Sequence, residues 1–260
     1  MQSWRWLWRG DLPADNIMVE FTDKAPELPA DMRRELDAFW LHEQARGGER
    51  VLFDGPLAQY LGHEPADDHL KLHLGRCGYA HWLFSAGRGE ELERRFGTGV
   101  AARPLALCAG LITEGGEVLM QRRSVQVAEG AGLLHVPGGH LDPDSHRLNG
   151  RPDPTTAMRV ELAEELGLGG TEIGDGRLLG LIENLENGKP ELIYTWRLEA
   201  GRDETAQRWR NARDRFESRE ISFEDIHGLI RRVARSTSSE EVADIAVPSR
   251  ALLTCLASDA

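Results

Sequence analysis

The sequence has little cysteine and no long hydrophobic run. Its three cysteines, Cys77, Cys108 and Cys255, form no CxxC pair, so the sequence predicts neither a disulfide framework nor a zinc site. No apolar stretch approaches the roughly 20 residues that a membrane span requires. Residues 1–10 lack the apolar core and the cleavage site of a signal peptide. From these absences we expect a cytoplasmic protein that contacts no membrane.

An excess of basic charge is also missing, since the formal net charge is −12. Proteins that bind nucleic acid through its phosphates need a basic surface, so a nucleic-acid partner is not expected. A small nucleoside diphosphate substrate is compatible with the acidic charge, because Mg²⁺ can bridge acidic side chains to phosphate. The chain of 260 residues is long enough to bury a sizeable core.

The strongest local pattern lies between residues 136 and 168. Asp153 is a suitable N-cap, Pro154 suits the first helical position, and Gly167 supplies a stop signal. The spacing therefore predicts a short helix between them. One face of this helix is apolar and is expected to pack against a core: Met158, Leu162 and Leu166.

Another face of the same helix carries Glu161, Glu164 and Glu165. Like charges at this spacing destabilise a helix, and no Lys or Arg follows three or four residues later to compensate. Oxygen-only ligands suit Mg²⁺ or Mn²⁺, so the pattern predicts a site for a divalent cation. For an isolated helix, the alternative is a solvated acidic face.

A double glycine, Gly138–Gly139, precedes this helix at the end of the stretch LLHVP. The segment predicts a buried strand that breaks into a turn. Because glycine has no side chain, its main-chain groups can approach a ligand or a metal closely. The alternative is an ordinary turn between a strand and a loop.

Together, the glycines and VELAEELGL at 160–168 resemble the Nudix box of the Nudix hydrolases, G-x5-E-x7-R-E-U-x-E-E-x-G-U with U aliphatic. Gly139 would open the box. Val160 stands where the family has Arg, and Ser145 stands where it has the first Glu. The loop 142–152 is about seven residues longer than the pattern allows. The missing Arg normally helps to hold the glutamates, so this departure bears on catalysis more than on metal binding.

The remaining hydrophobic patterns predict an α+β fold. The resemblance implies an α/β/α sandwich around a mixed sheet in residues 101–260. Residues 1–100 are expected to form an N-terminal α+β extension that could recognise the nucleoside. Strands are expected at 4–8, 16–21, 51–56, 69–75, 104–113, 115–124, 177–184, 191–198 and 219–223, and helices at 30–45, 153–166, after an N-cap at Ser222, and from Pro248.

A closer resemblance covers most of the chain. The segments LFDGP at 52–56, LHLG at 72–75, RRSVQVAEGAGLLHVPGGH at 122–140 and VPSRALL at 247–253 resemble the UDP-glucose and UDP-galactose diphosphatase branch of the Nudix hydrolases. In that branch a long box loop and the absence of Arg before the first box glutamate are normal. The resemblance implies Mg²⁺-dependent hydrolysis of a UDP-sugar to UMP and sugar 1-phosphate.

The resemblance also implies roles for individual residues. Glu161 and Glu165 would hold the metal, Glu164 would be a third ligand or a base, and the Gly138–Gly139 backbone, Gly139 above all, would supply a main-chain ligand. A further glutamate from a neighbouring strand or loop often serves in this family. The sequence offers three candidates, and the alternative for each is a solvated carboxylate at a strand end: Glu183, Glu191 and Glu186.

Substrate contacts are expected from two groups of residues. Candidates for the diphosphate and the sugar are Arg122, Arg123, Gln126, Gly138 and His140, because arginine pairs bidentately with phosphate and the others adjoin the box. Uracil requires stacking and hydrogen bonds. The candidates for stacking are Phe53, Tyr79 and Trp82, and the alternative for each is a place in the core.

Other functions stay open at this point. One is a Nudix hydrolase that acts on ADP-ribose, a dinucleotide or coenzyme A, and another is a non-catalytic nucleotide-binding Nudix module. Retention of all three box glutamates favours the hydrolases. Nudix proteins often form homodimers, but nothing in this sequence marks an interface.

Overall fold

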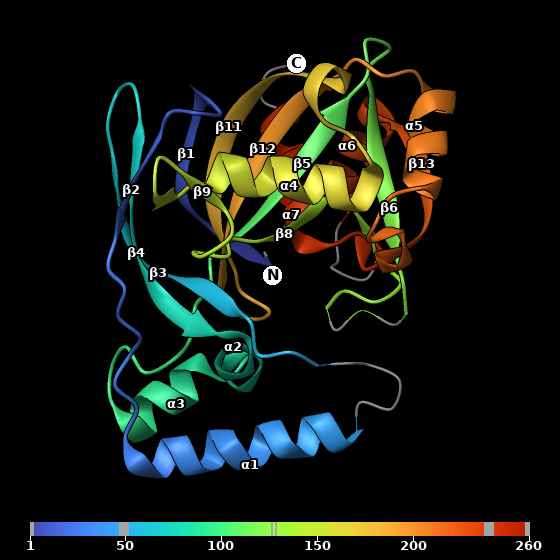
Figure 1. The fold of residues 1–260 in the computed structure, drawn as a ribbon. Coiled ribbons are helices and arrows are strands. Elements are labelled where there is room, and N and C mark those ends of the chain that lie inside the picture. The colour runs from blue at the N-terminus through green and yellow to red at the C-terminus, as the bar shows by residue number, and fades with distance from the viewer. Residues whose placement is uncertain (1–2, 47–51, 126, 128, 237–241, 258–260) are drawn as a thin grey trace.

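The computed structural model describes residues 3–46, 52–125, 127, 129–236 and 242–257. Its centre is an eight-stranded mixed sheet in the order β1-β11-β12-β5-β6-β13, with β7 beside β6 and β8 beside β5 (Figure 1). The strands are β1 (Trp4–Pro13), β5 (Ala106–Ile112), β6 (Glu117–Arg123), β7 (Leu134–His135), β8 (Gly138–His140), β11 (Ile173–Asn184), β12 (Lys189–Leu198) and β13 (Ser218–Asp225).

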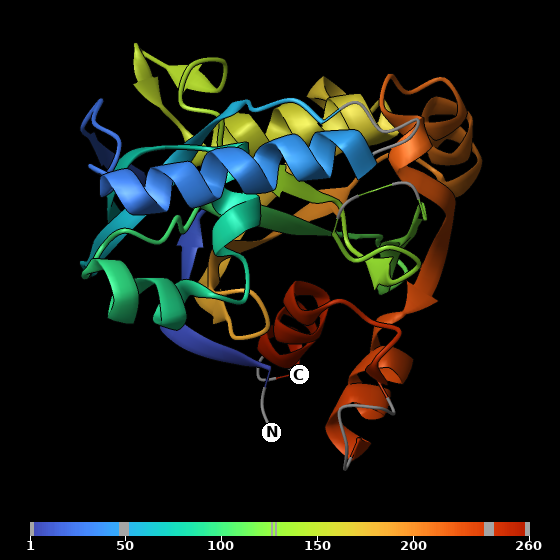
Figure 2. The same ribbon diagram turned by 90° about the horizontal axis from the view of Figure 1, so that it is seen from below.

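Helices cover both faces of this sheet. The helix α4 (Pro154–Leu166) lies on one face, and α7 (Val247–Leu256) lies on the other beside α6 (Ile226–Arg235) (Figure 2). The central strands β5 and β12 run parallel and are buried along nearly their whole length, as expected for strands that are covered on both sides. The predicted α+β sandwich is therefore confirmed.

The first part of the chain forms a smaller sheet in the order β2-β4-β3, with helices packed below it in Figure 1. Leu70, Leu72 and Leu74 of β4 are fully buried while the residues between them face outward, so the predicted alternation is confirmed. The elements are β2 (Ile17–Phe21), α1 (Ala30–Arg46), β3 (Pro56–Pro65), β4 (Leu70–Gly78), α2 (Tyr79–Ser85) and α3 (Gly89–Phe96).

The two parts of the chain share hydrogen bonds. The strand β1 pairs antiparallel with β11, so the large sheet takes a strand from each side of residue 100. The Ala58 main-chain N–H donates to the Leu141 carbonyl at 2.8 Å. The division into residues 1–100 and 101–260 stays a prediction about folding units.

The local signals around α4 act as expected. The Asp153 side chain accepts a hydrogen bond from the Thr156 N–H, and Gly167 ends the helix in the left-handed region at φ 68°. Short elements surround this helix and complete the chain: β9 (Arg147–Leu148), β10 (Arg151–Pro152), the 3₁₀ turns η1 (Gly170–Glu172) and η2 (Arg215–Glu217), and α5 (Arg202–Arg210). Among the described helices, none is long and apolar enough to cross a membrane.

Three local predictions were wrong. Residues 52–55 form no strand, because the Asp54 carboxylate instead accepts from the Ala80 N–H, and β3 begins only at Pro56; Val51 lies outside the described residues. Ser222 lies inside β13, and the N-cap of α6 is Asp225, whose side chain accepts from two main-chain N–H groups. The double glycine is not a free turn, because it belongs to β8 and pairs with β5.

Candidate active site

The candidate site forms where β5 changes partners. At one end β5 pairs with β6 through Ile112 and Val118, whereas at the other end it pairs with β8 over Ala106–Cys108. The divergence of β5 and β6 leaves room for β8, which places Gly139 opposite Leu107. Helix α4 packs over β8, so the main chain at Gly139 meets the side chains of α4.

Glu161 lies directly against Gly139. A Cβ atom added to Gly139 would lie 2.0 Å from Glu161 Oε1, closer than any real contact, so a larger residue fits here only if the Glu161 carboxylate moves away. The pKa of Glu161 is raised to about 8, mainly by burial and also by the charges of Glu217 and Glu164, while a main-chain hydrogen bond from His140 acts in the opposite direction. This carboxylate therefore sits beside main-chain atoms with little compensating positive charge.

Glu165, one helical turn later, is more deeply buried. Its side chain is 3% exposed, and its Oε2 atom is enclosed without a hydrogen-bond partner. Burial, followed by the charges of Glu161 and Glu217, raises its pKa well above the usual value. A buried carboxylate oxygen without a partner is costly, and a cation bound between Glu161 and Glu165 would relieve this cost.

The third box glutamate faces a different direction. Glu164 is partly exposed and forms an ion pair with Arg213. In its place, Glu217 of η2 comes near Glu161, although no local pattern of the sequence pointed to Glu217. Burial raises the pKa of Glu217, and Arg123, which lies 3.8 Å from it, lowers that pKa.

The donor set fits a hard divalent cation. Within the described ranges, no three His, Cys, Asp or Glu side chains are spaced to hold a metal ion as a group. Mg²⁺, however, is usually bound through one or two carboxylates, with water and substrate phosphate as its other ligands. Glu161, Glu165 and the Gly139 main chain match that requirement, because the Glu165 oxygen is free and the Glu161 carboxylate abuts Gly139.

A cavity of about 630 Å³ opens beside these groups. Of the residues expected to bind substrate, Phe53, Arg123, Gly138, Gly139 and His140 line it, and Glu161, Glu186 and Glu191 line it as well. Gln126 lies outside the described residues. Trp82, Glu164 and Glu165 do not line the cavity. Three further candidates do not line it either: Arg122, Tyr79 and Glu183.

These three candidates lie elsewhere and have other contacts. Arg122 donates to Glu220 and to the Gly132 carbonyl at the surface of β6. Glu183 forms ion pairs with Arg5 and Arg103. The ring of Tyr79 packs edge-on against Trp40 at 6.5 Å between centroids.

The cavity also contains polar residues that the sequence patterns did not single out. Lys189 is buried, and its ammonium donates to Glu129 at 2.6 Å and lies 3.3 Å from the His140 Nε2 atom. Lys189 is one of three lysines in the chain and stands just before the strand predicted at 191–198. These two features could have marked it as a candidate in the sequence. His135, Asp142 and His146 complete the unexpected polar lining.

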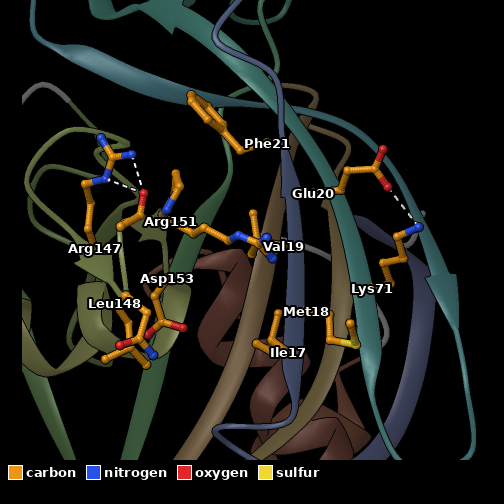
Figure 3. Close-up of a pocket in the computed structure, with 13 residues that line it drawn as sticks. Ile17, Met18, Val19, Glu20, Phe21, Lys71, Arg147, Leu148, Arg151 and Asp153 are labelled. Atoms are coloured by element: carbon orange, nitrogen blue, oxygen red, sulfur yellow. Dashed lines mark hydrogen bonds and ion pairs between the residues drawn. The ribbon is translucent and has the colours of Figure 1, made fainter.

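A second, larger cleft of about 910 Å³ lies between β2 and the β9–β10 hairpin (Figure 3). The Glu20–Lys71 ion pair, at 2.9 Å, lies along one side, and Arg147 on the other side donates to the carbonyl of Gly150. None of the box glutamates lines this cleft. We therefore place the candidate active site in the smaller cavity, which is lined by Glu161, Arg123 and Gly139.

The sequence is similar to those of known proteins. The chain is 30% identical over 162 residues to "Uridine diphosphate glucose pyrophosphatase NUDT22" of Mus musculus, over 55% of this chain and 50% of the mouse protein. It is 27% identical over 207 residues to the Homo sapiens protein of the same name, over 67% of this chain and 66% of that protein. It is 23% identical over 247 residues to "Nudix hydrolase 9" of Arabidopsis thaliana, over 81% of this chain and 78% of that protein. The match to the mouse protein thus spans about half of that protein's length.

The family model described as NUDIX domain matches residues 102–239, which are more than half of the chain. The matched range runs from β5 through the glycines and α4 to α6, so it contains the glutamates, Gly139 and Arg123. The resemblance seen in the sequence is thereby confirmed, and the chain belongs to the Nudix family.

Proposed function

We propose that the protein hydrolyses the diphosphate linkage of a nucleotide sugar, and that UDP-glucose and UDP-galactose are its substrates. Water attacks one phosphorus atom, the bridging P–O bond breaks, and the products are UMP and sugar 1-phosphate. The observation that carries the proposal is the pair Glu161 and Glu165, of which one abuts Gly139 and the other keeps a buried oxygen without a partner. The names of the mouse and human relatives support the choice of a UDP-sugar.

In this proposal the chain holds Mg²⁺ or Mn²⁺ through Glu161, Glu165 and the Gly139 main chain. The bound cation would neutralise the diphosphate and acidify the attacking water. Glu217 lies near Glu161 and lines the same cavity, so we assign the role of the further glutamate to it rather than to Glu183 or Glu191.

Arg123 is the cavity arginine that can contact the phosphates. Its guanidinium is held by the Glu129 carbonyl at 3.0 Å, and its side chain is mostly buried. A guanidinium fixed in this way can donate two parallel hydrogen bonds to phosphate without reorganising. Its position beside Glu217 would bring the substrate phosphates next to the carboxylates.

A substrate panel tests the proposal. Purified protein with Mg²⁺ is incubated with UDP-glucose, UDP-galactose, ADP-ribose, a dinucleotide and coenzyme A, and the products are separated by chromatography. We expect UMP and sugar 1-phosphate from the two UDP-sugars. Cleavage of ADP-ribose with both UDP-sugars intact would make the substrate assignment wrong. If no compound is cleaved but one raises the melting temperature, the protein is a binding module.

A variant tests the residue assignment. Glu165→Gln preserves shape but removes the charge, and we expect it to lower turnover at least about 100-fold, which corresponds to roughly 3 kcal/mol of transition-state stabilisation. Glu172→Gln is the control, because Glu172 is also a partly buried carboxylate but pairs with Arg208 outside the cavity. Wild-type turnover in Glu165→Gln would remove Glu165 from the site.

A further inference from the structure

The cavity has a second polar group beside the box glutamates, which we call the Lys189 corner. It consists of Glu129, His140, Asn184, Lys189 and Glu191, all of which line the cavity. The sheet register creates it: His140 of β8 pairs with Ala106, which in turn pairs with Glu191 of β12. Side chains in one row of a sheet share a face, so His140 and Glu191 lie on the same face, with Lys189 two residues before Glu191.

The charges that act on the corner differ from those that act on Glu161, although Arg123 acts on both Glu191 and Glu165. The charges that act on Glu191 are those of Lys189, Glu129 and Arg123. The charges that act on Glu161 are those of Glu217, Glu164 and Asp214. The corner therefore forms a distinct part of the cavity wall with its own chemistry.

Glu191 has an unused acceptor. Its side chain is 4% exposed, and its Oε1 atom accepts one hydrogen bond, from the Asn184 amide at 3.2 Å. Among the described residues, its other carboxylate oxygen has no hydrogen-bond partner. A buried carboxylate on a cavity wall can accept a hydrogen bond from a ligand through the oxygen that the protein leaves unused.

Lys189 supplies a donor on the same wall of the cavity. Its ammonium group has three N–H bonds, of which Glu129 at 2.6 Å takes one and the His140 Nε2 atom at 3.3 Å is placed to take another. The same ammonium lies 5.6 Å from the centre of the Trp82 ring, and Trp82 donates its indole N–H to Glu129. These contacts fix the position of the lysine and leave one N–H for a ligand.

The composition of the corner selects one class of ligand group. Glu129 and Glu191 outnumber Lys189, so a phosphate is disfavoured there. The corner offers no open aromatic face for a base, because Trp82 is buried and carries Lys189 over its ring, whereas Phe53 on the same cavity is 75% exposed. A hydroxyl group both donates and accepts, so it can satisfy a free carboxylate oxygen and a free ammonium N–H together.

We propose that the Lys189 corner is the subsite for the sugar, in which Glu191 and Lys189 bind hydroxyl groups of the hexose. This inference rests on the proposed function, because it names the part of a nucleotide sugar that this wall of the cavity recognises. In this arrangement Asn184 orients the Glu191 carboxylate, and Phe53 is left for the base. Glu191 is then a specificity residue and does not hold the metal.

The test compares UDP-glucose with the methyl ester of UDP, which keeps uridine and the diphosphate linkage but carries methyl in place of the hexose. The wild-type protein should favour UDP-glucose in kcat/KM. Glu191→Gln keeps the size of the side chain but removes the charge that binds the hydroxyl group. We expect it to lower kcat/KM for UDP-glucose about 10- to 100-fold and to leave the methyl ester within about twofold.

Controls make the outcomes distinct. Glu199→Gln removes a surface carboxylate that follows the same strand and pairs with Arg197, and it should change neither rate. If Glu191→Gln lowers both rates equally, or neither, the sugar subsite is refuted. Asn184→Ala provides a second variant with the same expected selectivity if Glu191→Gln does not fold.

A binding measurement separates this inference from the proposed function. If the wild-type protein cleaves neither compound, the proposed function fails. Calorimetric binding of the two compounds then decides the subsite. Tighter binding of UDP-glucose by wild type than by Glu191→Gln, with equal binding of the methyl ester, supports the subsite, and equal binding of both compounds by both proteins overturns it.

Discussion

The two adjacent glycines of β8 give a sharp prediction, because the structure assigns a different reason to each. A Cβ atom at Gly139 would lie 2.0 Å from Oε1 and 2.8 Å from Oε2 of Glu161. A Cβ atom at Gly138 would instead lie 2.5 Å from the Leu107 carbonyl oxygen and 3.1 Å from the Cys108 Cα atom. The first clash is with the end of a side chain, and the second is with the main chain of the sheet.

Gly139→Ala should therefore act on catalysis rather than on stability. The Glu161 carboxylate must retreat by about 1 Å to restore a normal contact, and a misplacement of this size lowers rates about 100-fold. Because the helix and sheet need not move, we expect the melting temperature to change little. In Gly138→Ala the new methyl group would clash with main-chain atoms of β5, which cannot move aside without disturbing the sheet. This overpacking should lower the free energy of unfolding by about 1–3 kcal/mol.

Both variants are measured by hydrolysis of UDP-glucose with Mg²⁺ and by thermal unfolding. Titration with Mn²⁺ in a calorimeter adds a readout that does not depend on turnover, and Gly139→Ala should weaken binding of the ion. The reasoning is refuted if Gly139→Ala turns over at the wild-type rate. It is also refuted if Gly139→Ala loses as much stability as Gly138→Ala, because the clash would then have moved the backbone.

Further predictions concern contacts around the site. Arg76→Ala removes the contacts of Arg76 with Asp23 at 2.6 Å and Asp144 at 2.7 Å, and steady-state kinetics should show a several-fold higher KM for UDP-glucose with little change in melting temperature. Lys189→Met removes the ion-pair partner of Glu129, whose side chain is 29% exposed and keeps the Trp82 indole N–H as a donor, so urea unfolding should show a loss of about 1–3 kcal/mol, part of which the added change Glu129→Gln restores. Burial raises the pKa of Glu129, but Lys189 and His140 outweigh it and hold that pKa below its usual value. The stabilisation by ionised Glu129 is then present above the unfolded pKa and is lost as the pH falls, so wild type should lose more stability than Glu129→Gln between about pH 6 and pH 3. Asp225→Ala removes the N-cap of α6 and should cost about 1 kcal/mol in the same assay, and Asp225→Asn should restore most of it.

Predictions from the sequence were correct where the signals are local. The start and the end of α4 depend on Asp153, Pro154 and Gly167, which act on main-chain groups within a few residues. The alternation of Leu70, Leu72 and Leu74 depends only on the two-residue repeat of a strand. Such signals need no knowledge of the neighbouring elements, so the sequence alone contains them.

The parts that could not be predicted depend on contacts between distant segments. The helical spacing predicted that Glu161, Glu164 and Glu165 share one face. In the structure α4 packs against β8, and Glu164 instead forms an ion pair with Arg213. Lys189 of β12 and Glu129 of the segment between β6 and β7 are 60 residues apart in the chain, and only the tertiary fold brings them together. Glu217 is likewise brought near Glu161 by η2, a turn that no local pattern predicted, just before the strand expected at 219–223.

The long box loop and the N-terminal extension are best understood together. The loop is the part of the box that departs from the general Nudix pattern in length, and it is also the part that the extension holds. Arg76 of β4 forms a bidentate ion pair with Asp144 of the loop, and the Ala58 N–H of β3 donates to the Leu141 carbonyl just before it. The same extension supplies Phe53, Gly55, Pro56 and Leu57 to the cavity wall. A longer loop without these contacts would lose conformational order, so the N-terminal residues and the loop stabilise one another beside the cavity.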